Sequence, residues 1–526
     1  MAATSHASTV DHALAWVMPA ATMQQWLVIL PVALCLTVGA GLMMMRHQIR
    51  WHPLVAIVSL LVLTVLDGLL LWRVSVDGPI TMMMGRWLPP FGIAFTVDLT
   101  GALFALAAAL VSLAGSIYAL GDIGGSGRRY GFYPFLMVLT AGVTGAFLTG
   151  DIFNLYVWFE VLLVSSFGLL ILGSEREQID GALKYAILNL LGTTLFLIGV
   201  GYLYAIFGTL NMADIARKAG ELRDIAPLMT LSALFILAFG MKAAAFPVNF
   251  WLPASYHTPR VVVSALFAGV LTKVGVYALL RVMVMLLPVE REALSIVIGI
   301  AAALSMLLGA LGALAQRDVR RFMGFIIIVG IGNILAGAAI GGVAGVAPAL
   351  FYALHSIVLM TALYLVSGEI GWRTGSFKLD RIGGLWRSAP LFSAVALALF
   401  LAGSGLPPFS GFWPKAMLVK ASLDIGAWWL TASILVSGFL ITMAFARLFL
   451  LGFWRPMPDV SPAVAASAHP PKGDWVRLAP ILALSVLIVG FGVFPEQLLQ
   501  LCQRAAEGLA DPTAYIQSVF GKGGAS

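Results

Sequence analysis

Five titratable side chains stand within long apolar runs of this sequence: Glu160, Lys242, Lys273, His355 and Lys415. A charge at the centre of a bilayer costs at least about 2.5–3.5 kcal/mol on insertion scales, and such residues usually face a protein interior or a water path. Burial and neighbouring charges shift the pKa of lysine, histidine and carboxyl groups toward values at which protons exchange. The set therefore indicates a proton relay inside a membrane protein.

The order of these residues suggests a direction for the relay. We expect a proton to enter near Glu160 and Lys242, to pass Lys273 and His355 with water between them, and to leave at Lys415. A carboxylate that moves toward or away from Lys242 would raise or lower the pKa of that lysine and push the proton on. The structural alternatives are an ion pair that only fixes helix packing and a hydrogen-bonded core histidine.

Proline interrupts two of the apolar runs, each time beside a lysine. The segment 245–253 (AFPVNFWLP) follows Lys242, and the segment 407–414 (PPFSGFWP) precedes Lys415. Proline removes a backbone donor and breaks a helix, and broken backbone at membrane depth is tolerated only where protein or a water-filled cavity surrounds it. We therefore predict two broken helices that line the transfer path.

Three further titratable residues are secondary candidates. Asp151 begins the run that holds Glu160, His257 lies in the loop after the first interruption, and Arg447 stands near the end of its run. His257 also suits an interfacial anchor, and Arg447 is near enough to a span end to extend its guanidinium to the headgroups, which favours a structural role.

Composition indicates the elements that must hold these residues. The 526 residues are 60% hydrophobic and 10% charged, and the mean hydropathy is +0.98, which excludes a soluble domain of this length. Apolar stretches long enough to span a bilayer recur throughout. We predict an all-α membrane protein with about 14 transmembrane helices, at roughly 26–45, 54–72, 97–118, 131–149, 152–172, 183–207, 227–250, 261–287, 293–315, 322–342, 346–368, 389–412, 427–453 and 478–495.

Basic residues between the spans set the expected orientation. With both termini placed outside, the cytoplasmic loops contain more Lys and Arg than the outer side, where Arg281 is counted. The net charge of +7 is then topogenic and does not indicate nucleic acid. Residues 455–475 read as a flexible hydrophilic loop. Cys35 and Cys502 cannot form a zinc or iron–sulfur site, and no phosphate-binding, dinucleotide or nucleophile motif occurs, so we predict no metal, cofactor or catalytic residue.

A weak internal repeat accompanies the two interruptions. The segment 245–253 resembles 407–414, and residues 184–189 (KYAILN) resemble 351–356 (FYALHS). Five spans per copy, an odd number, would make the copies inverted, as in many transporters. We therefore divide the chain into N-terminal helices (1–130), a first five-helix repeat (131–287), a second (293–453), and a loop with a last helix (454–526).

At these residues the sequence resembles the antiporter-like subunits shared by respiratory complex I and the multisubunit Mrp-type (Mnh, Sha, Pha) cation/proton antiporters. The resemblance covers nearly the whole chain, and it is stronger to the D-type subunits of the Mrp antiporters than to the complex I homologues. A lysine at Lys415 suits the D type, and the long C-terminal extension of the A type does not occur. The motifs that carry the resemblance are GDIFNLYVWFE ending at Glu160, FGMKAAAFPVNFWLP with Lys242, LTKVGVYALLR with Lys273 and SGLPPFSGFWPK with Lys415.

The resemblance implies a Glu160–Lys242 pair, a central line of Lys273, His355 and Lys415, and a protein that works only beside other membrane subunits. It implies Na⁺ or K⁺ exchange for protons in the inner membrane of a bacterium, by part of a secondary transporter that is not an enzyme. One departure is the segment IVLM after His355–Ser356, because some members carry a lysine there.

Three other functions fit the same sequence. The first is a proton-pumping membrane subunit of a respiratory NADH dehydrogenase or membrane-bound hydrogenase. Neighbouring genes that encode redox subunits would favour this function. The second is a solute carrier that works without other subunits. The buried charges argue against it, because in the sequence they form a line and not one compact pocket. The third is a passive scaffold, in which the buried lysines would be dispensable.

Overall fold

The computed structural model describes residues 21–223, 226–458 and 474–521. Both ends of the chain and most of the predicted loop 455–475 lie outside the described residues. The helices up to the first interruption are α1 (Met23–Met44), α2 (His52–Asp77), η2 (Met84–Arg86), α3 (Leu99–Asp122), α4 (Gly125–Arg129), α5 (Phe132–Leu148), α6 (Ile152–Leu170), α7 (Arg176–Phe207), α8 (Met212–Leu222) and α9 (Leu228–Ala243).

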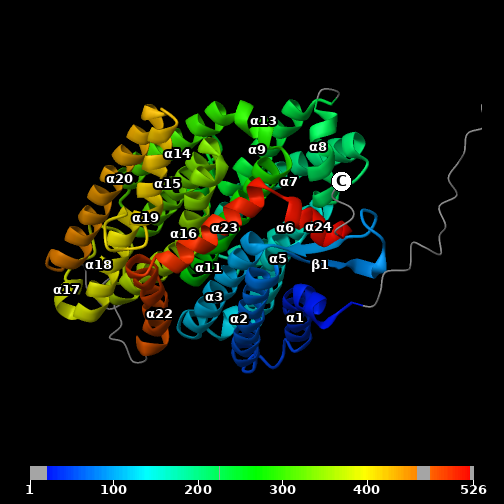
Figure 1. Cartoon of the computed structure of the whole chain (residues 1–526). Helices are drawn as coiled ribbons and strands as arrows, with labels where there is room; N and C mark the ends of the chain where they lie inside the picture. Colours follow the sequence, from blue (N-terminus) through cyan, green and yellow to red (C-terminus); the bar gives the residue numbers. More distant parts are fainter. Residues whose placement is uncertain (1–20, 224–225, 459–473, 522–526) are drawn as a thin grey trace, which may run out of the picture.

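The second part of the chain is also helical (Figure 1). Its elements are α10 (Trp251–Ser255), α11 (Val261–Leu266), η3 (Phe267–Leu271), α12 (Thr272–Leu280), η4 (Arg281–Leu286), α13 (Pro288–Ala293), α14 (Ser295–Ala315), α15 (Val319–Ile340), α16 (Gly342–Thr374), α17 (Leu385–Ser388), α18 (Pro390–Ser404), α19 (Phe412–Asp424), α20 (Trp428–Phe449), η5 (Leu450–Trp454), α22 (Asp474–Val493), α23 (Glu496–Ala510) and α24 (Thr513–Phe520).

Membrane spanning explains most of these helices. Within the described residues, 11 helical segments are long and apolar enough to cross a bilayer, the sections α11 to η4 counting as one. Three shorter apolar helices, α5, α9 and α18, match the predicted spans 131–149, 227–250 and 389–412. The protein is thus a multi-pass membrane protein, as the composition predicts.

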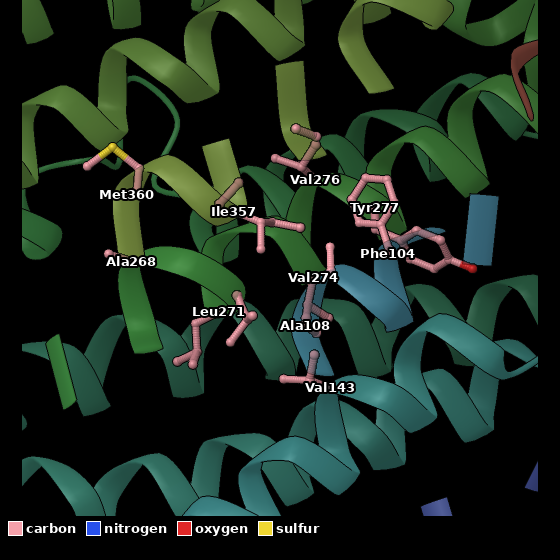
Figure 2. Close-up of a cluster of buried hydrophobic side chains, with 14 of the residues drawn as sticks. Phe104, Ala108, Val143, Ala268, Leu271, Val274, Val276, Tyr277, Ile357 and Met360 are labelled. Atoms are coloured by element: carbon pink, nitrogen blue, oxygen red, sulfur yellow. The ribbon is translucent and has the colours of Figure 1, made fainter. Parts of the chain in front are cut away.

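Two segments form the centre of the bundle. The most apolar windows of Val261–Leu286 and Gly342–Thr374 are 100% buried, whereas those of α1 and α2 are only 33% buried. Figure 2 shows where the central segments meet: side chains such as Val274, Ile357 and Met360 pack together beside Ala108 and Val143. Residues placed on these two segments are therefore held away from lipid.

The two predicted helix breaks are present. α9 ends at Ala243, and Ala244 takes a left-handed conformation (φ 59°). The indole of Trp251, on α10, donates to the carbonyl of Met241 at 3.1 Å and so binds the freed end of α9. α18 likewise ends at Ser404, followed by a left-handed glycine (φ 81°), before the chain resumes as α19.

Several features differ from the sequence prediction. Residues predicted as a loop form an antiparallel hairpin of β1 (Ile80–Met83) and β2 (Ala94–Val97), which pairs Thr81 with Thr96. The last helix predicted, now α22, is followed by α23 and α24. Figure 1 shows α23 running obliquely over the bundle, and it packs against α16 and α3. The hairpin and the C-terminal helices escape prediction because their stability depends on packing against the rest of the bundle.

The placement of Arg281 in an outer loop is wrong. This side chain is only 1% exposed and lies in η4, inside the buried central segment. It belongs to an ion pair with Asp98 at the start of α3, and the distance of 2.6 Å between Nη1 and Oδ2 explains how the bundle accommodates the charge.

Candidate functional site

Lys242 occupies the last turn of α9, directly before the first break. The residue is 5% exposed, and its Nζ has no hydrogen-bond partner among the described residues. Nζ lies 5.7 Å from the ring centre of Phe159 on α6, a distance that favours a cation–π contact. Within the described residues, the ammonium group of Lys242 is therefore held by no carbonyl.

Glu160 follows Phe159 on α6 and is half-buried. It is the charged group that acts electrostatically on Lys242, although no ion pair within 4.0 Å joins the two in the part of the chain that the structure describes. The expected partner is therefore close enough to influence Lys242 without holding it in contact.

A glycine allows α9 to approach the central segment. A Cβ built on Gly275 would lie 2.8 Å from the amide nitrogen of Ala243 and 3.0 Å from Cβ of Lys242. Such distances leave no room for a side chain, so α12 and α9 pack backbone to backbone. The turn that carries Lys273 is thus fixed directly against the turn that carries Lys242.

Lys273 lies at the start of α12 and is fully buried. Its Nζ donates a hydrogen bond to the carbonyl of Ala268 at 2.7 Å, within the π-helical turn η3. π-helical turns are rare and occur frequently at functional sites. This carbonyl is uncharged, so the contact holds a proton on Lys273 without the negative charge of a carboxylate.

His355 lies in the middle of α16, where it is 1% exposed. Its Nδ1 is 2.8 Å from Oγ of Ser410, in the loop of the second break. Positive charges on Lys415 and Lys273 both act electrostatically on this imidazole. The structure thus brings His355 within electrostatic range of both lysines.

Lys415 stands in the first turn of α19, beyond the second break. Its Nζ donates to the carbonyl of Ser404 at 2.8 Å and approaches that of Gly403 at 3.5 Å. These carbonyls end α18, so the ammonium group caps the negative end of the helix dipole. Lys242 therefore belongs to α9, the helix that ends at the first break. Lys415 lies beyond the second break and caps α18, the helix that ends there.

The secondary candidates have structural partners. Asp151 is the N-cap of α6 and accepts a hydrogen bond from the amide of Asn154 at 2.8 Å. Arg447 donates to the carbonyl of Leu314 near the end of α14, which favours the structural role expected of it. Neither side chain is placed among the five central residues by a hydrogen bond or an ion pair in the described chain.

His257 joins the loop after α10 to the start of α15. Its Nδ1 is 2.9 Å from the carbonyl of Pro253 and therefore carries a hydrogen, while Nε2 accepts from Nη2 of Arg321 at 3.1 Å. Burial, followed by the charges of Arg321 and Arg320, lowers the pKa of His257 below its ordinary 6.5. His257 therefore connects the segment after α10 with α15, and neither of these two contacts involves His355.

Several buried acidic residues of the described chain lie outside the predicted relay, and three of them are placed on transmembrane helices or at a helix start. Asp98 pairs with Arg281, Glu369 accepts from Arg373 (3.2 Å) and Arg477 (2.5 Å), and both oxygens of buried Asp67 have no hydrogen-bond partner among the described residues. Arg281 lies 183 positions from Asp98 and Arg477 lies 108 positions from Glu369, so no local pattern reveals these two partners. The one available signal was that residue 281 falls inside the predicted span 261–287. No cluster of three or more His, Cys, Asp or Glu that could hold a metal occurs in the described chain.

The fold and these residues define a class: integral membrane helical bundles with two interrupted helices and buried basic side chains. A family model described as "NADH:quinone oxidoreductase/Mrp antiporter, TM" matches residues 149–442. The chain belongs to this family.

Curated relatives are similar over nearly their full lengths. The D subunit of the Na⁺/H⁺ antiporter of Alkalihalophilus pseudofirmus is 34% identical over 497 residues, which is 94% of this chain and 99% of the relative. The protein of the same name from Bacillus subtilis is 34% identical over 493 residues, with the same coverage.

Solved structures show the same fold. A chain of the Mrp complex from Dietzia sp. DQ12-45-1b superposes with a TM-score of 0.87 at 29% identity, covering 95% of this chain and all of that one. A chain of the membrane-bound sulfane sulfur reductase, an archaeal respiratory membrane complex, gives 0.86 at 26% identity, covering 94% and 99%. A chain of respiratory complex I from Thermus thermophilus gives 0.78 at 25% identity, covering 92% and 99%.

Proposed function

We propose that this chain is the proton-translocating subunit of a multisubunit Na⁺(K⁺)/H⁺ antiporter. It forms part of a transporter and performs no catalysis of its own. The observation that carries the proposal is the position of His355, at the second break and within electrostatic range of both Lys273 and Lys415. Similarity to proteins named as D subunits of Na⁺/H⁺ antiporters supports the same conclusion.

The five central residues have separate roles in this mechanism. Lys242 receives a proton and passes it toward Lys273, on the helix packed against it at Gly275. Water connects Lys273 with His355, and Lys415 releases the proton on the other side. Each group can both hold and release a proton, which a relay requires.

Glu160 acts as a movable charge. Because it influences Lys242 without a contact ion pair, its side chain can approach the ammonium group to favour protonation and withdraw to favour release. We assign structural roles to the secondary candidates: Asp151 caps α6, His257 accepts from Arg321, and Arg447 donates to the carbonyl of Leu314.

The architecture is a 14-span bundle with two inverted five-helix repeats, 131–287 and 293–453. The three shorter apolar helices α5, α9 and α18 complete the number of spans. Matched breaks, each starting with a left-handed residue after the first half-helix, support the repeat. Paired broken helices in inverted halves suit a path that opens alternately to either side.

The protein works in the inner membrane of a bacterium, beside other membrane subunits of the antiporter, with both termini outside. Bacterial relatives that are named as antiporter subunits support this setting. The exposed apolar faces of α1 and α2 lie against lipid or neighbouring subunits. Exchange of Na⁺ or K⁺ for protons would serve control of the internal pH.

A second function has specific support. Chains of a respiratory sulfane sulfur reductase and of complex I share this fold at 26% and 25% identity. In that case the same relay would be driven by electron transfer in partner subunits, as in an NADH dehydrogenase or a membrane-bound hydrogenase. The line of basic side chains serves either function, so only the energy source distinguishes them.

The test is cation-dependent collapse of a proton gradient in everted vesicles. The host lacks its own antiporters and expresses the chain with the products of neighbouring genes. We expect Na⁺ or K⁺ to collapse the gradient, and the effective cation names the substrate. If neither cation acts on an assembled complex, the antiporter proposal is rejected in favour of the redox-driven function.

A further inference from the structure

A row of polar side chains, called the polar file below, leads away from the proposed relay along the helix that carries Lys273. Tyr277 and Arg281 follow it at successive intervals of four residues, which places all three on one helix face. Nη2 of Arg281 donates to the hydroxyl of Tyr277 at 2.8 Å. This file points toward the C-terminal helices, away from His355.

Beyond Arg281 the file continues to the surface. The ring of Tyr515, on α24, lies 5.5 Å from the guanidinium carbon, and its hydroxyl is hydrogen-bonded to Thr96. Thr96 accepts a hydrogen bond from the hydroxyl of Thr81 at 3.1 Å. The same Thr81 hydroxyl lies 2.8 Å from Oγ of half-buried Ser518. Hydroxyl groups donate and accept hydrogen bonds, so this outer part of the file is able to pass protons.

The inner part of the file narrows to one group, the hydroxyl of Tyr277, which Arg281 holds through its hydrogen bond. The hydroxyl of Tyr277 donates to the carbonyl of Phe147 at 2.8 Å, so its hydrogen points away from Arg281. The rings of Phe104 and Phe147 pack at 5.5 and 4.9 Å from that of Tyr277. Figure 2 shows Phe104 and Tyr277 together at the edge of the buried cluster. These rings exclude water around the hydroxyl.

Arg281 itself cannot conduct a proton. A guanidinium group has five donors and no acceptor and stays charged in proteins. Both oxygens of its partner are engaged: Nη1 is 2.6 Å from Oδ2 of Asp98, and Nη2 is 2.7 Å from Oδ1. Oδ1 also accepts from the amide of Gly101 at 2.9 Å. The guanidinium therefore has no lone pair for an incoming proton, and both carboxylate oxygens of its partner are already hydrogen-bonded to it.

We propose that Arg281, held by Asp98, is the positioning residue that seals the file between Lys273 and the surface at α24. The seal forces a proton on Lys273 to move to His355, so that proton flow stays coupled to cation exchange. This inference rests on the proposed relay. The competing explanation is a clasp that only fastens α24 and η4 to α3, which predicts lower stability without proton leakage.

The test measures passive decay of a preformed pH gradient in vesicles without Na⁺ or K⁺. The whole complex carries Asp98→Asn with Arg281→Gln, which removes both charges together and leaves no unpaired ion. We expect decay several-fold faster than in the wild type, and near wild-type decay when Lys273→Met is added. Asp98→Asn with Arg281→Met gives a second neutral pair.

Arg291→Met is the matched control. Arg291 is also a buried arginine near the end of a central segment, but it donates to the carbonyls of Ala338 and Ala339 at 3.3 and 3.2 Å and is not on the helix face of Lys273. We expect no leak from this variant. Equal leakage in Arg291→Met, or leakage that survives Lys273→Met, would overturn the seal, because the leak would then be general loosening.

The remaining outcomes separate the seal from the relay. Assembled double variants that do not leak reject the seal, while loss of coupled exchange in Lys242→Ala would still support the relay. If both double variants fail to assemble, the pair is a folding requirement and the clasp replaces the seal. If Lys242→Ala keeps coupled exchange, the relay fails whatever the leak assay shows.

Discussion

Nδ1 of His355 lies 2.8 Å from the hydroxyl oxygen of Ser410. The contact joins the buried helix α16 to the loop between α18 and α19, where the second helix is interrupted. A backbone break therefore supplies a polar partner for a buried histidine. Because a hydrogen bond at Nδ1 restricts rotation of the ring, Ser410 orients the central group of the proposed relay.

Ser410→Ala should slow cation-dependent proton exchange by about two- to tenfold, because a hydrogen bond contributes about 0.5–1.5 kcal/mol net. The rate is measured in vesicles with matched amounts of assembled complex. Ser433→Ala is the control, since this hydroxyl donates to the carbonyl of Trp429 within its own helix. A rate in Ser410→Ala equal to that of the control would show that the contact does not orient the histidine.

Gly275→Ala should lower both stability and exchange. The added Cβ would meet the backbone at Ala243 and Cβ of Lys242, at 2.8 and 3.0 Å. Overpacking of this kind costs about 1–3 kcal/mol and would displace Lys242 from the neighbouring helix. Thermal unfolding and exchange rates are compared with Gly201→Ala, where no atom lies within 4 Å. Tolerance of alanine at 275 would contradict the close packing of α9 on α12.

Lys415→Arg separates capping from proton release. Arginine keeps the positive charge and the donors for the carbonyls of Gly403 and Ser404, so the thermal stability of the complex should stay near that of wild type. It cannot release a proton, and exchange should fall by at least about tenfold. Lys415→Met should lose exchange and also about 1–3 kcal/mol of stability, because it leaves a buried carbonyl unpaired. An active Lys415→Arg variant would remove Lys415 from the relay.

His257 should make stability depend on pH. Burial and then Arg321 and Arg320 lower the pKa of His257, so the unfolded chain binds more protons than the folded one below about pH 6.5. The stability from the neutral ring is thus present above 6.5 and is lost as pH falls toward the lowered folded pKa. Protonation also removes the acceptor for Arg321.

The measurement for His257 is the thermal midpoint of the complex at pH 7.5 and pH 5.5. His257→Asn should show a smaller fall than the wild type over this interval. His47→Asn is the control, because His47 is exposed. The same fall in wild type and His257→Asn would show that this histidine does not titrate between folded and unfolded states.

Features that depend on local sequence were predicted well. The apolar runs mark the helices that cross the bilayer, and the prolines at 247 and 407–408 lie at the two breaks, where a missing backbone donor favours an interruption. Lys242, Lys273 and His355 were recognised because a titratable group in an apolar run is costly anywhere. Their burial is confirmed, while their part in proton transfer stays a prediction.

Features that depend on distant contacts were not predicted. Asp98 and Arg281 meet across 183 positions, so neither neighbourhood signals the pair. The hairpin of β1 and β2 consists of two four-residue strands that only mutual pairing and packing stabilise. The approach of α9 to α12 depends on a glycine whose role is visible only when the neighbouring backbone is in place.

The central claim is that Lys242 carries a proton during exchange. The direct measurement is the Na⁺- or K⁺-dependent collapse of a proton gradient in everted vesicles, with wild type, Lys242→Ala, Glu160→Ala and the control Lys420→Ala, whose exposed side chain pairs with Asp424. Blots verify equal assembly. The relay predicts that the first two variants lose exchange while the control keeps it. Wild-type exchange in an assembled Lys242→Ala complex would contradict the relay and make the buried charges structural.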